Sequence, residues 1–318
     1  MPKPQRAPAK KGAVKATHDA FFSHASQDLG FALPLAKALD GDGLKIWIDG
    51  DNIEVGALLR DGLQSAIQCS RVLVLFWSEH ALKSRWVMAE VFTAFHSNRF
   101  ILPVVLDTTP LPQFLARTVY LDRKRDGGSM GEKLSKAIRA APAERNEAHF
   151  FIGTLDEDTQ ALMNAIGQAQ YQVMDLVLTD RKKAAKASEA VTTALETLVK
   201  LAAMHPMTLN LQGYQCKNTY LVKHWEIVQA GRKAQDPLLE QGEHYFFEAL
   251  CLNPTDVNAV NGLGSILICD LELNAAEFFV RRSLEVFKAA GIEGSYAAAE
   301  SDLRLILRLK GQQQAGVY

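Results

Sequence analysis

The sequence has little of what marks a secreted, zinc-binding or membrane protein. Its 318 residues include only 4 cysteines, no two of them in a C-x-x-C pair. We therefore expect reduced thiols in a cytosolic protein, not a disulfide or zinc framework. The 8 histidines form no H-E-x-x-H or paired-ligand spacing, so no metal is expected. The longest apolar runs fall well short of the ~18 residues of a membrane-spanning helix, which excludes a membrane protein. The N-terminus lacks the apolar core of a secretory signal.

A strong excess of one charge is also missing. The chain has 35 basic and 36 acidic residues, a net charge of −1, so no global field attracts nucleic acid or anionic lipid. The local exception is residues 1–17, with five basic residues, three prolines and no acidic residue. This segment buries too little apolar surface to offset its ordering entropy, so we predict a disordered, solvated arm.

Residues 18–145 alternate short apolar runs with amphipathic stretches, as parallel strands covered by helices on both faces do. The predicted strands are Asp19–Phe22, Lys45–Ile48, Val72–Trp77, Phe100–Leu106 and Thr118–Leu121. Helical patterns lie between them, and a last helix is expected at Gly131–Ala140. Pro34 is expected to shorten or kink the first helix. The pattern predicts a flavodoxin-like α/β domain with a five-stranded parallel sheet, in which ligands bind at the carboxyl ends of the strands.

Residues 146–318 are predicted to form an all-α domain, because no strand candidate follows Thr154. Thr154-Leu-Asp-Glu157 has the pattern of a capping box that opens a helix. Further on, a 34-residue helix-turn-helix pattern resembles tetratricopeptide (TPR) repeats, in which small residues let two helices approach closely. Its residues are Val260, Leu263, Gly264, Leu267 and Ala276, preceded by Gly242, Phe246, Ala249 and Pro254. Two to three repeats fit, which predicts a short cap or oligomerisation module. Whether residues 147–205 join it stays open.

Aromatic and polar residues gather where the first three strands end and the next helix begins. They are Phe22, Ser23, Trp47, Asp49, Ser84, Trp86 and Glu90. At 100° per residue, Trp86 and Glu90 share one face of a helix for which Ser84 is a natural N-cap. We therefore expect Glu90 to point into a crevice that Phe22 and Trp47 also reach.

Four of these segments, in this order, resemble the Toll/interleukin receptor (TIR) family. They are Asp19–His24, the loop that runs from Trp47 to Gly56, the Ser84-x-Trp86-x-x-x-Glu90 signature and Ile101–Leu106. The resemblance implies a TIR domain of the NAD-hydrolysing bacterial type. In such enzymes the acid of the W-x-x-x-E motif is catalytic, and the position of Trp47 lies beside the nicotinamide ring.

The resemblance makes Glu90 the candidate catalytic residue and six others candidates for substrate binding: Phe22, Ser23, Trp47, Asp49, Ser84 and Trp86. Several of the six suit structural roles equally well. Ser84 suits a helix cap, Trp86 a packing anchor, Trp47 packing at a strand end, and Asp49 a turn held by its own side chain.

The residue types suit cleavage of the nicotinamide–ribose bond. The bond releases neutral nicotinamide and leaves a ribose cation, which a carboxylate such as Glu90 stabilises in a dry pocket. Trp47 offers a stacking face for the pyridinium ring, worth ~0.5–2 kcal/mol. No G-x-G-x-x-G loop is present, which argues against a redox Rossmann enzyme.

The resemblance thus implies a cytosolic NAD⁺ hydrolase (nucleosidase) that gives nicotinamide and ADP-ribose, or cyclic ADP-ribose. It further implies activation by TIR self-assembly and a role as a bacterial immune or antiphage effector. NAD⁺ is the expected substrate, with no added cofactor and no membrane or nucleic-acid partner. The helical half would set the assembly state or receive a protein or ligand trigger. The alternative is a non-catalytic TIR scaffold that binds other TIR domains or peptides.

Overall fold

The computed structural model describes residues 16–48, 59–145, 154–290 and 293–314. Residues 1–15 of the predicted arm lie outside this part of the chain, as does Asp49. Contacts divide the chain into two compact units. The first comprises Met1–Ser78, Glu90–Thr108 and Thr118–Asn146, and the second comprises Glu79–Ala89, Thr109–Arg117 and Glu147–Tyr318.

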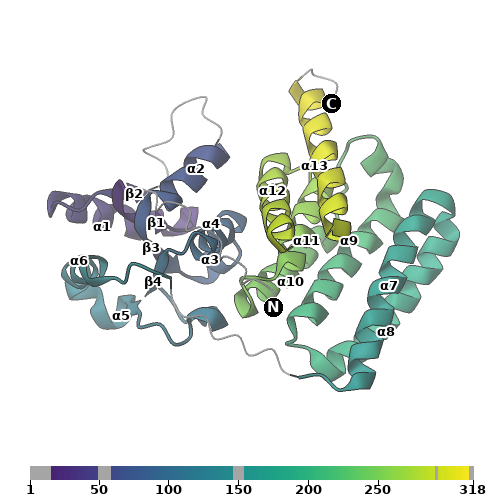
Figure 1. Ribbon diagram of the computed structural model, residues 1–318, viewed down its shortest axis with the longest axis horizontal. Helices are drawn as coiled ribbons and strands as arrows, with labels where there is room; N and C mark the ends of the chain where they lie inside the picture. Colours follow the sequence, from purple (N-terminus) through teal and green to yellow (C-terminus); the bar gives the residue numbers. More distant parts are fainter. Residues whose placement is uncertain (1–15, 49–58, 146–153, 291–292, 315–318) are drawn as a thin grey trace, which may run out of the picture. The chain divides into compact units, whose positions relative to one another are not determined.

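The first unit is built on a five-stranded parallel sheet (Figure 1). The strands are β1 (His18–Ser23), β2 (Ile46–Ile48), β3 (Ser70–Trp77), β4 (Phe100–Val105) and β5 (Leu121–Asp122). Their order is β2-β1-β3-β4-β5, which is the flavodoxin-like order and confirms the predicted fold class. β5 lies later than predicted, because Thr118–Tyr120 precede the strand and Val119 is 87% exposed.

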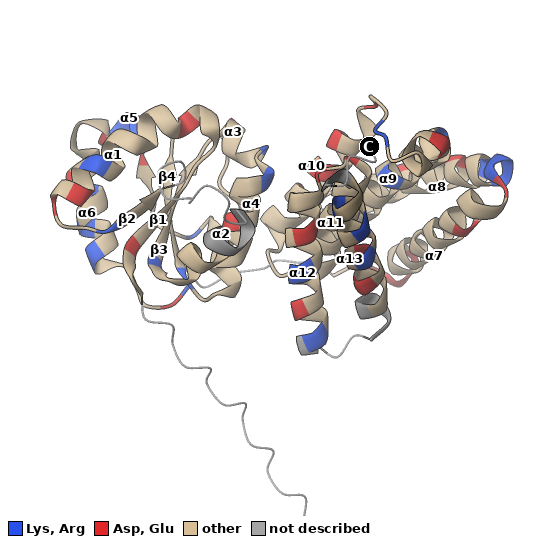
Figure 2. Cartoon of the chain, turned by 90° about the horizontal axis from the view of Figure 1, so that it is seen from above, with Lys and Arg blue, Asp and Glu red and all other residues tan. Residues whose placement is uncertain are grey.

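Helices cover both faces of this sheet (Figure 2). Helices α1 (Leu29–Gly41) and α6 (Met130–Ala140) pack on one face, and α2 (Leu59–Gln68) lies on the other with residues 90–96 of α4 (Arg85–His96). Pro34 does not shorten the first helix, because α1 continues through it to Gly41. The other expected effect, a kink, stays a prediction. Pro34 lies near the N-terminus of the helix, so its missing N–H removes one hydrogen bond only.

The second unit is dominated by helices, which confirms the predicted helical region. They are α7 (Glu157–Thr179), α8 (Arg181–Ala202), α9 (Pro206–Gln229), α10 (Leu238–Leu252), α11 (Val257–Cys269), α12 (Leu273–Ala290) and α13 (Glu293–Gln314). Each helix packs on the next, and α7, α9, α11 and α13 also contact one another in turn. The array therefore has a row of first helices and a row of second helices, as helix-turn-helix repeats do.

The residues of the 34-residue pattern are packing residues in this array. The ring of Phe246 fits between Gly213 of α9 and Gly262 of α11, and a Cβ atom at Gly213 would lie 2.7 Å from that ring. Gly242 and Gly264 make similar close approaches, to Ile266 and Val280 respectively. Glycine is needed at these positions because any side chain would push two helices apart.

The pattern is incomplete in the repeat before α11. A step of 34 residues back from Val257 falls at Lys223, inside α9 and next to a kink at His224 (φ −122°, ψ 20°). The expected start of the first helix of that repeat therefore lies inside the long α9. The second helix, α10, begins at Leu238, about 34 residues before the start of α12 at Leu273. This explains why Gly242 and Phe246 match the pattern although the residues before them do not.

Residues 154–205 belong to the same unit as the repeats. Buried amides join their helices to α9, because Gln170 donates to the carbonyl oxygen of Leu211 at 2.7 Å and Gln215 donates to that of Ser188 at 3.0 Å. The predicted capping box is wrong in its first residue. Asp156, and not Thr154, caps α7, by accepting from the backbone N–H of Thr159 at 2.8 Å. Aspartate is at least as good an N-cap as threonine, so the N-cap of α7 lies two residues later than predicted.

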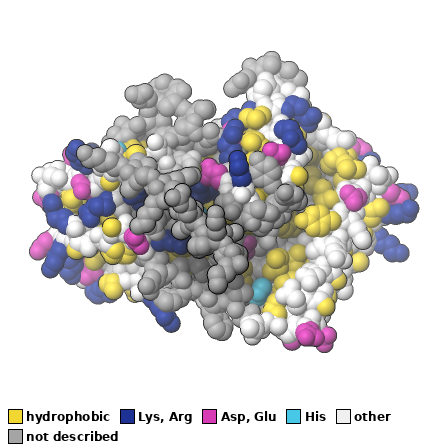
Figure 3. Space-filling view, in the orientation of Figure 1, with side chains coloured by type: hydrophobic (Ala, Val, Ile, Leu, Met, Phe, Trp, Pro, Cys, Tyr) yellow, Lys and Arg dark blue, Asp and Glu magenta, His cyan; other side chains and the backbone are white. Residues whose placement is uncertain are grey.

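Hydrophobic side chains also reach the surface of the helical array (Figure 3). Among the large ones, Tyr171 and Leu178 of α7, Leu201 of α8 and Met204 are each more than half exposed. All four lie in or beside the first helix pair of the array. The oligomerisation role expected of this module stays a prediction.

Candidate active site

Glu90 is buried on α4, the helix that follows β3. Its exposed fraction is 4%, which is low for a carboxylate. Trp86, one turn earlier on the same helix, is half-buried. Ser84 caps this helix as predicted: its Oγ accepts from the backbone N–H of Val87 at 3.3 Å. The W-x-x-x-E motif therefore places an indole and a carboxylate on one helix face, with the carboxylate shielded from bulk water.

The structure brings Trp47 together with Phe21, and not with Phe22. The two rings stack with centroids 4.5 Å apart at an angle of 13°, and Trp47 is 6% exposed. β1 pairs Phe21 with Trp47 in register, so their side chains point to the same face of the sheet. Ser23, two residues on, shares this face and is fully buried. The face is the one on which α2 and α4 lie (Figure 2).

Phe22 points to the opposite face, beneath α1 and α6. It is fully buried and meets Phe76 edge-on, with centroids 5.0 Å apart. The expected crevice shared by Phe22 and Trp47 is thus not what the structure shows. Side chains alternate along a strand, so the parity of positions 21, 22 and 23 already separates Phe22 from Ser23. The substrate role of Phe22 stays a prediction. Its buried position in the core beneath α1 and α6 favours a packing role instead.

A polar pair lies where β1 and β3 end, and the sequence analysis did not predict it. Ser78, directly after β3, donates to Asp28 Oδ2 at 2.6 Å. Asp28 stands at the N-cap position of α1 but makes no capping bond with its side chain. The carboxylate instead links the segment after β1 to the end of β3. An aspartate before a helix predicts a cap, so no local pattern indicates this contact with Ser78, fifty residues away.

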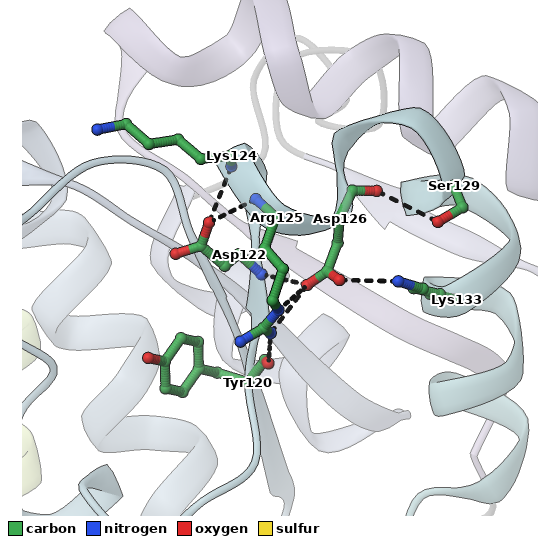
Figure 4. Close-up of polar contacts among 7 residues, drawn as sticks. All are labelled: Tyr120, Asp122, Lys124, Arg125, Asp126, Ser129 and Lys133. Atoms are coloured by element: carbon green, nitrogen blue, oxygen red, sulfur yellow. Dashed lines mark hydrogen bonds and ion pairs between the residues drawn. The ribbon is translucent and has the colours of Figure 1, made fainter.

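A second polar cluster lies at the end of β5 (Figure 4). Asp126 of α5 (Arg123–Asp126) is buried and accepts from Arg125 at 2.9 Å, Lys133 at 2.8 Å and the backbone N–H of Asp122 at 2.8 Å. These donors, Arg125 first, hold the pKa of Asp126 well below its ordinary value. Such a carboxylate stays ionised near neutral pH, so it suits fixing β5 to α6 better than proton transfer.

In the described part of the chain, no three or more His, Cys, Asp or Glu side chains gather in a way that would hold a metal ion. The helices traced in the same ranges are each too short or too polar to cross a bilayer.

The sheet order defines a flavodoxin-like domain, and its motif helix has a cap at Ser84 and a buried carboxylate at Glu90. Residues 21–139 match the family model described as a TIR domain. This part of the chain is a TIR domain.

Similarity to curated relatives is confined to a part of each protein. This chain is 32% identical over 103 residues to the probable 2′ cyclic ADP-D-ribose synthase TcpO of Methanobrevibacter olleyae, covering 31% of this chain and 30% of that protein. It is 31% identical over 106 residues to the 2′ cyclic ADP-D-ribose synthase AbTIR of Acinetobacter baumannii, covering 29% and 39%. It is 29% identical over 93 residues to the NAD(+) hydrolase TcpC of Escherichia coli O6:H1, covering 27% and 30%. The chain thus spans at most 39% of the length of these relatives.

Proposed function

We propose that the TIR domain cleaves the bond between nicotinamide and ribose in NAD⁺, with Glu90 as the catalytic residue. The observation that carries the proposal is the buried carboxylate of Glu90, one turn after Trp86, on a helix capped by Ser84. The names of the relatives support the choice of NAD⁺, since one is an NAD(+) hydrolase and another a 2′ cyclic ADP-D-ribose synthase.

The chemistry needs a negative charge and no proton donor. When the C1′–N bond breaks, the electron pair leaves with nicotinamide, which departs neutral, and a cation forms on the ribose. A carboxylate shielded from water stabilises such a cation more than an exposed one does, because the surrounding dielectric constant is lower. Water then adds to C1′ and gives up a proton, which yields ADP-ribose.

The same cation leads to a cyclic product when a hydroxyl group of the ADP-ribose adds in place of water. Both routes share the first step and differ only in the nucleophile that follows. Relatives named for each product occur among the similar proteins. We therefore propose NAD⁺ cleavage as the activity and treat the product ratio as the quantity to be measured.

The structure supports the other candidate residues to different extents. One face of Trp47 is already covered by Phe21, so stacking on nicotinamide would have to use the rest of the ring. Of the Trp47–Gly56 segment that carries the TIR resemblance, only Trp47 and Ile48 belong to the described residues, so Asp49 lies outside them. Self-assembly, the cytosolic location and an antiphage role stay predictions.

The test is to incubate the full chain with NAD⁺ at several protein concentrations and to separate the products by chromatography. We expect nicotinamide release that rises more than linearly with protein concentration. We expect Glu90→Gln to lower the rate about 10²–10³-fold, as loss of one charge-stabilising group does. Glu189→Gln, on an exposed position of α8, is the matched control and should cleave NAD⁺ at the wild-type rate. Equal rates for wild type and Glu90→Gln would refute the catalytic assignment, and binding of TIR domains without turnover would favour the scaffold alternative.

A further inference from the structure

Arg85, between Ser84 and Trp86 in the signature, binds carboxylates that lie far away in the sequence. Within the second unit its guanidinium makes a two-pronged bond to Glu243 of α10, with Nε and one terminal nitrogen each donating at 2.8 Å. Asp270, after α11, is 3.5 Å away, and Glu272, before α12, is 3.6 Å away. One arginine thus meets three carboxylates.

The three carboxylates around Arg85 form a negatively charged, largely buried environment. The side chains of Glu243 and Asp270 are each 10% exposed, and Asp270 is also paired with Lys233. Burial raises the pKa of Glu243, and the bond from Arg85 counteracts that rise. A buried carboxylate without its partner is costly, so α10 depends on Arg85 for its charge balance. The pair also lines a cavity of about 880 Å³ that Lys233, Asp236 and His244 share.

The position of Arg85 gives this bond a consequence for Glu90. Arg85 is the first residue of α4, and Glu90 lies five residues later on the same unbroken helix. An α-helix moves as a rigid rod over so short a distance, so a clamp on its first residue restrains the residues one turn later. In this restrained state Glu90 is 4% exposed, which leaves little room for a ribose to reach its carboxylate.

We propose that Arg85 is a latch residue: its bonds to Glu243, Asp270 and Glu272 hold the start of α4 in a closed state and keep NAD⁺ cleavage low until they break. The inference rests on the proposed function and adds a means of regulation to it. A trigger that enters the cavity beside Arg85 would reach the latch directly. Arg85 acts through α4 and does not itself touch the reacting atoms.

The test removes both charges together, so that no buried charge is left alone. The double variant Arg85→Ala with Glu243→Gln should cleave NAD⁺ about 5- to 150-fold faster than wild type at equal protein concentration, the usual range of coupling between two sites. Arg85→Lys keeps the charge but loses the two-pronged geometry and should lie between the two. Arg281→Ala is the matched control, since it breaks the Arg281–Glu277 pair within α12 and should leave the rate unchanged.

A second measurement does not depend on catalysis. Hydrogen exchange of the backbone amides of residues 85–90 should be faster in the double variant than in wild type, also when Glu90→Gln is added to both. An exchange rate equal to that of wild type would overturn the latch. So would a cleavage rate equal to or below that of an active wild type.

The two proposals fail in different ways. If no variant cleaves NAD⁺ while exchange at residues 85–90 rises, the proposed function is wrong and the latch survives as a conformational device. If wild type cleaves NAD⁺ and the double variant gains neither rate nor exchange, the proposed function stands and the latch is wrong.

Discussion

The sheet unit and the helical unit use their diagnostic residues differently. In the helical unit, Gly242, Phe246 and Gly264 are buried, and each meets a side chain of a neighbouring helix. In the sheet unit, the diagnostic residue is an acid, Glu90, that is kept from solvent. A pattern of small and large apolar residues predicts how closely helices approach, whereas a buried acid on the helix of a signature motif predicts chemistry. The first kind predicts shape, and the second predicts function.

The largest expected effect tests whether Phe22 belongs to the core or to the site. Phe22→Ala should lower the free energy of unfolding by about 3–5 kcal/mol, because it empties a buried position against Phe76. Urea denaturation measures this loss. Phe22→Leu should cost less than about 1.5 kcal/mol and leave the KM for NAD⁺ unchanged. A several-fold rise in KM with little loss of stability would return Phe22 to the site.

The next effect tests the packing role of the helical pattern. Gly262→Ala should lower the free energy of unfolding by about 1–3 kcal/mol, because the added methyl group collides with the Phe246 ring. Gly311→Ala is the control: Gly311 is exposed on α13 with open space around it. It should gain about 0.5–1 kcal/mol from helix propensity. Equal effects of the two substitutions in urea denaturation would contradict the close approach of α10 and α11.

A smaller effect separates capping from substrate contact at Ser84. Ser84→Ala should cost about 1 kcal/mol in thermal or urea unfolding, because the N–H of Val87 loses its acceptor. Ser84→Asp keeps a side-chain acceptor for this N–H, so it should lower the free energy of unfolding by less than Ser84→Ala does. The KM for NAD⁺ should be the same in Ser84→Asp as in wild type. If Ser84 contacted the substrate, the new negative charge near the phosphates would raise KM strongly.

The last effect is present at neutral pH and disappears in acid. The pKa of Asp126 is lower in the folded chain than its ordinary value, so its ionised form contributes stability above about pH 4. That contribution is lost as the pH falls from there toward the folded pKa. Asp126→Asn should therefore be less stable than wild type at pH 7, and the difference should shrink below pH 4 in urea denaturation. A difference independent of pH would show that Asp126 acts by packing alone.

Much of the fold was predictable because its signals are local. The apolar runs of β1, β3 and β4 and the periodicity of the helices survive in the structure with small shifts at their ends. The errors arose where a neighbouring residue competed for the same role, as Asp156 did with Thr154 at the start of α7. The predicted range of β5 was wrong because a two-residue edge strand has almost no periodic pattern in the sequence.

The candidate site was predictable only in part. Trp86 and Glu90 on one helix face followed from their spacing, and Ser84 followed from cap chemistry. Phe22 and Trp47 lie on opposite faces, because the register of β1 with β2 pairs Trp47 with Phe21. That register cannot be read from the local sequence. The pair of Arg85 and Glu243 joins residues 158 positions apart. A contact of that kind depends on the packed array and leaves no mark in the local sequence.

The ring of Phe246, held between Gly213 and Gly262, has a consequence for how the helical array comes apart. In an ordinary solenoid the repeats fray one after another from the ends, since each contacts only its neighbours. Here the Phe246 side chain packs between α9 and α11, so we expect α9, α10 and α11 to unfold as one cooperative block. Fraying is then confined to the outer members of the array, where a bound partner gains the most by ordering what it touches.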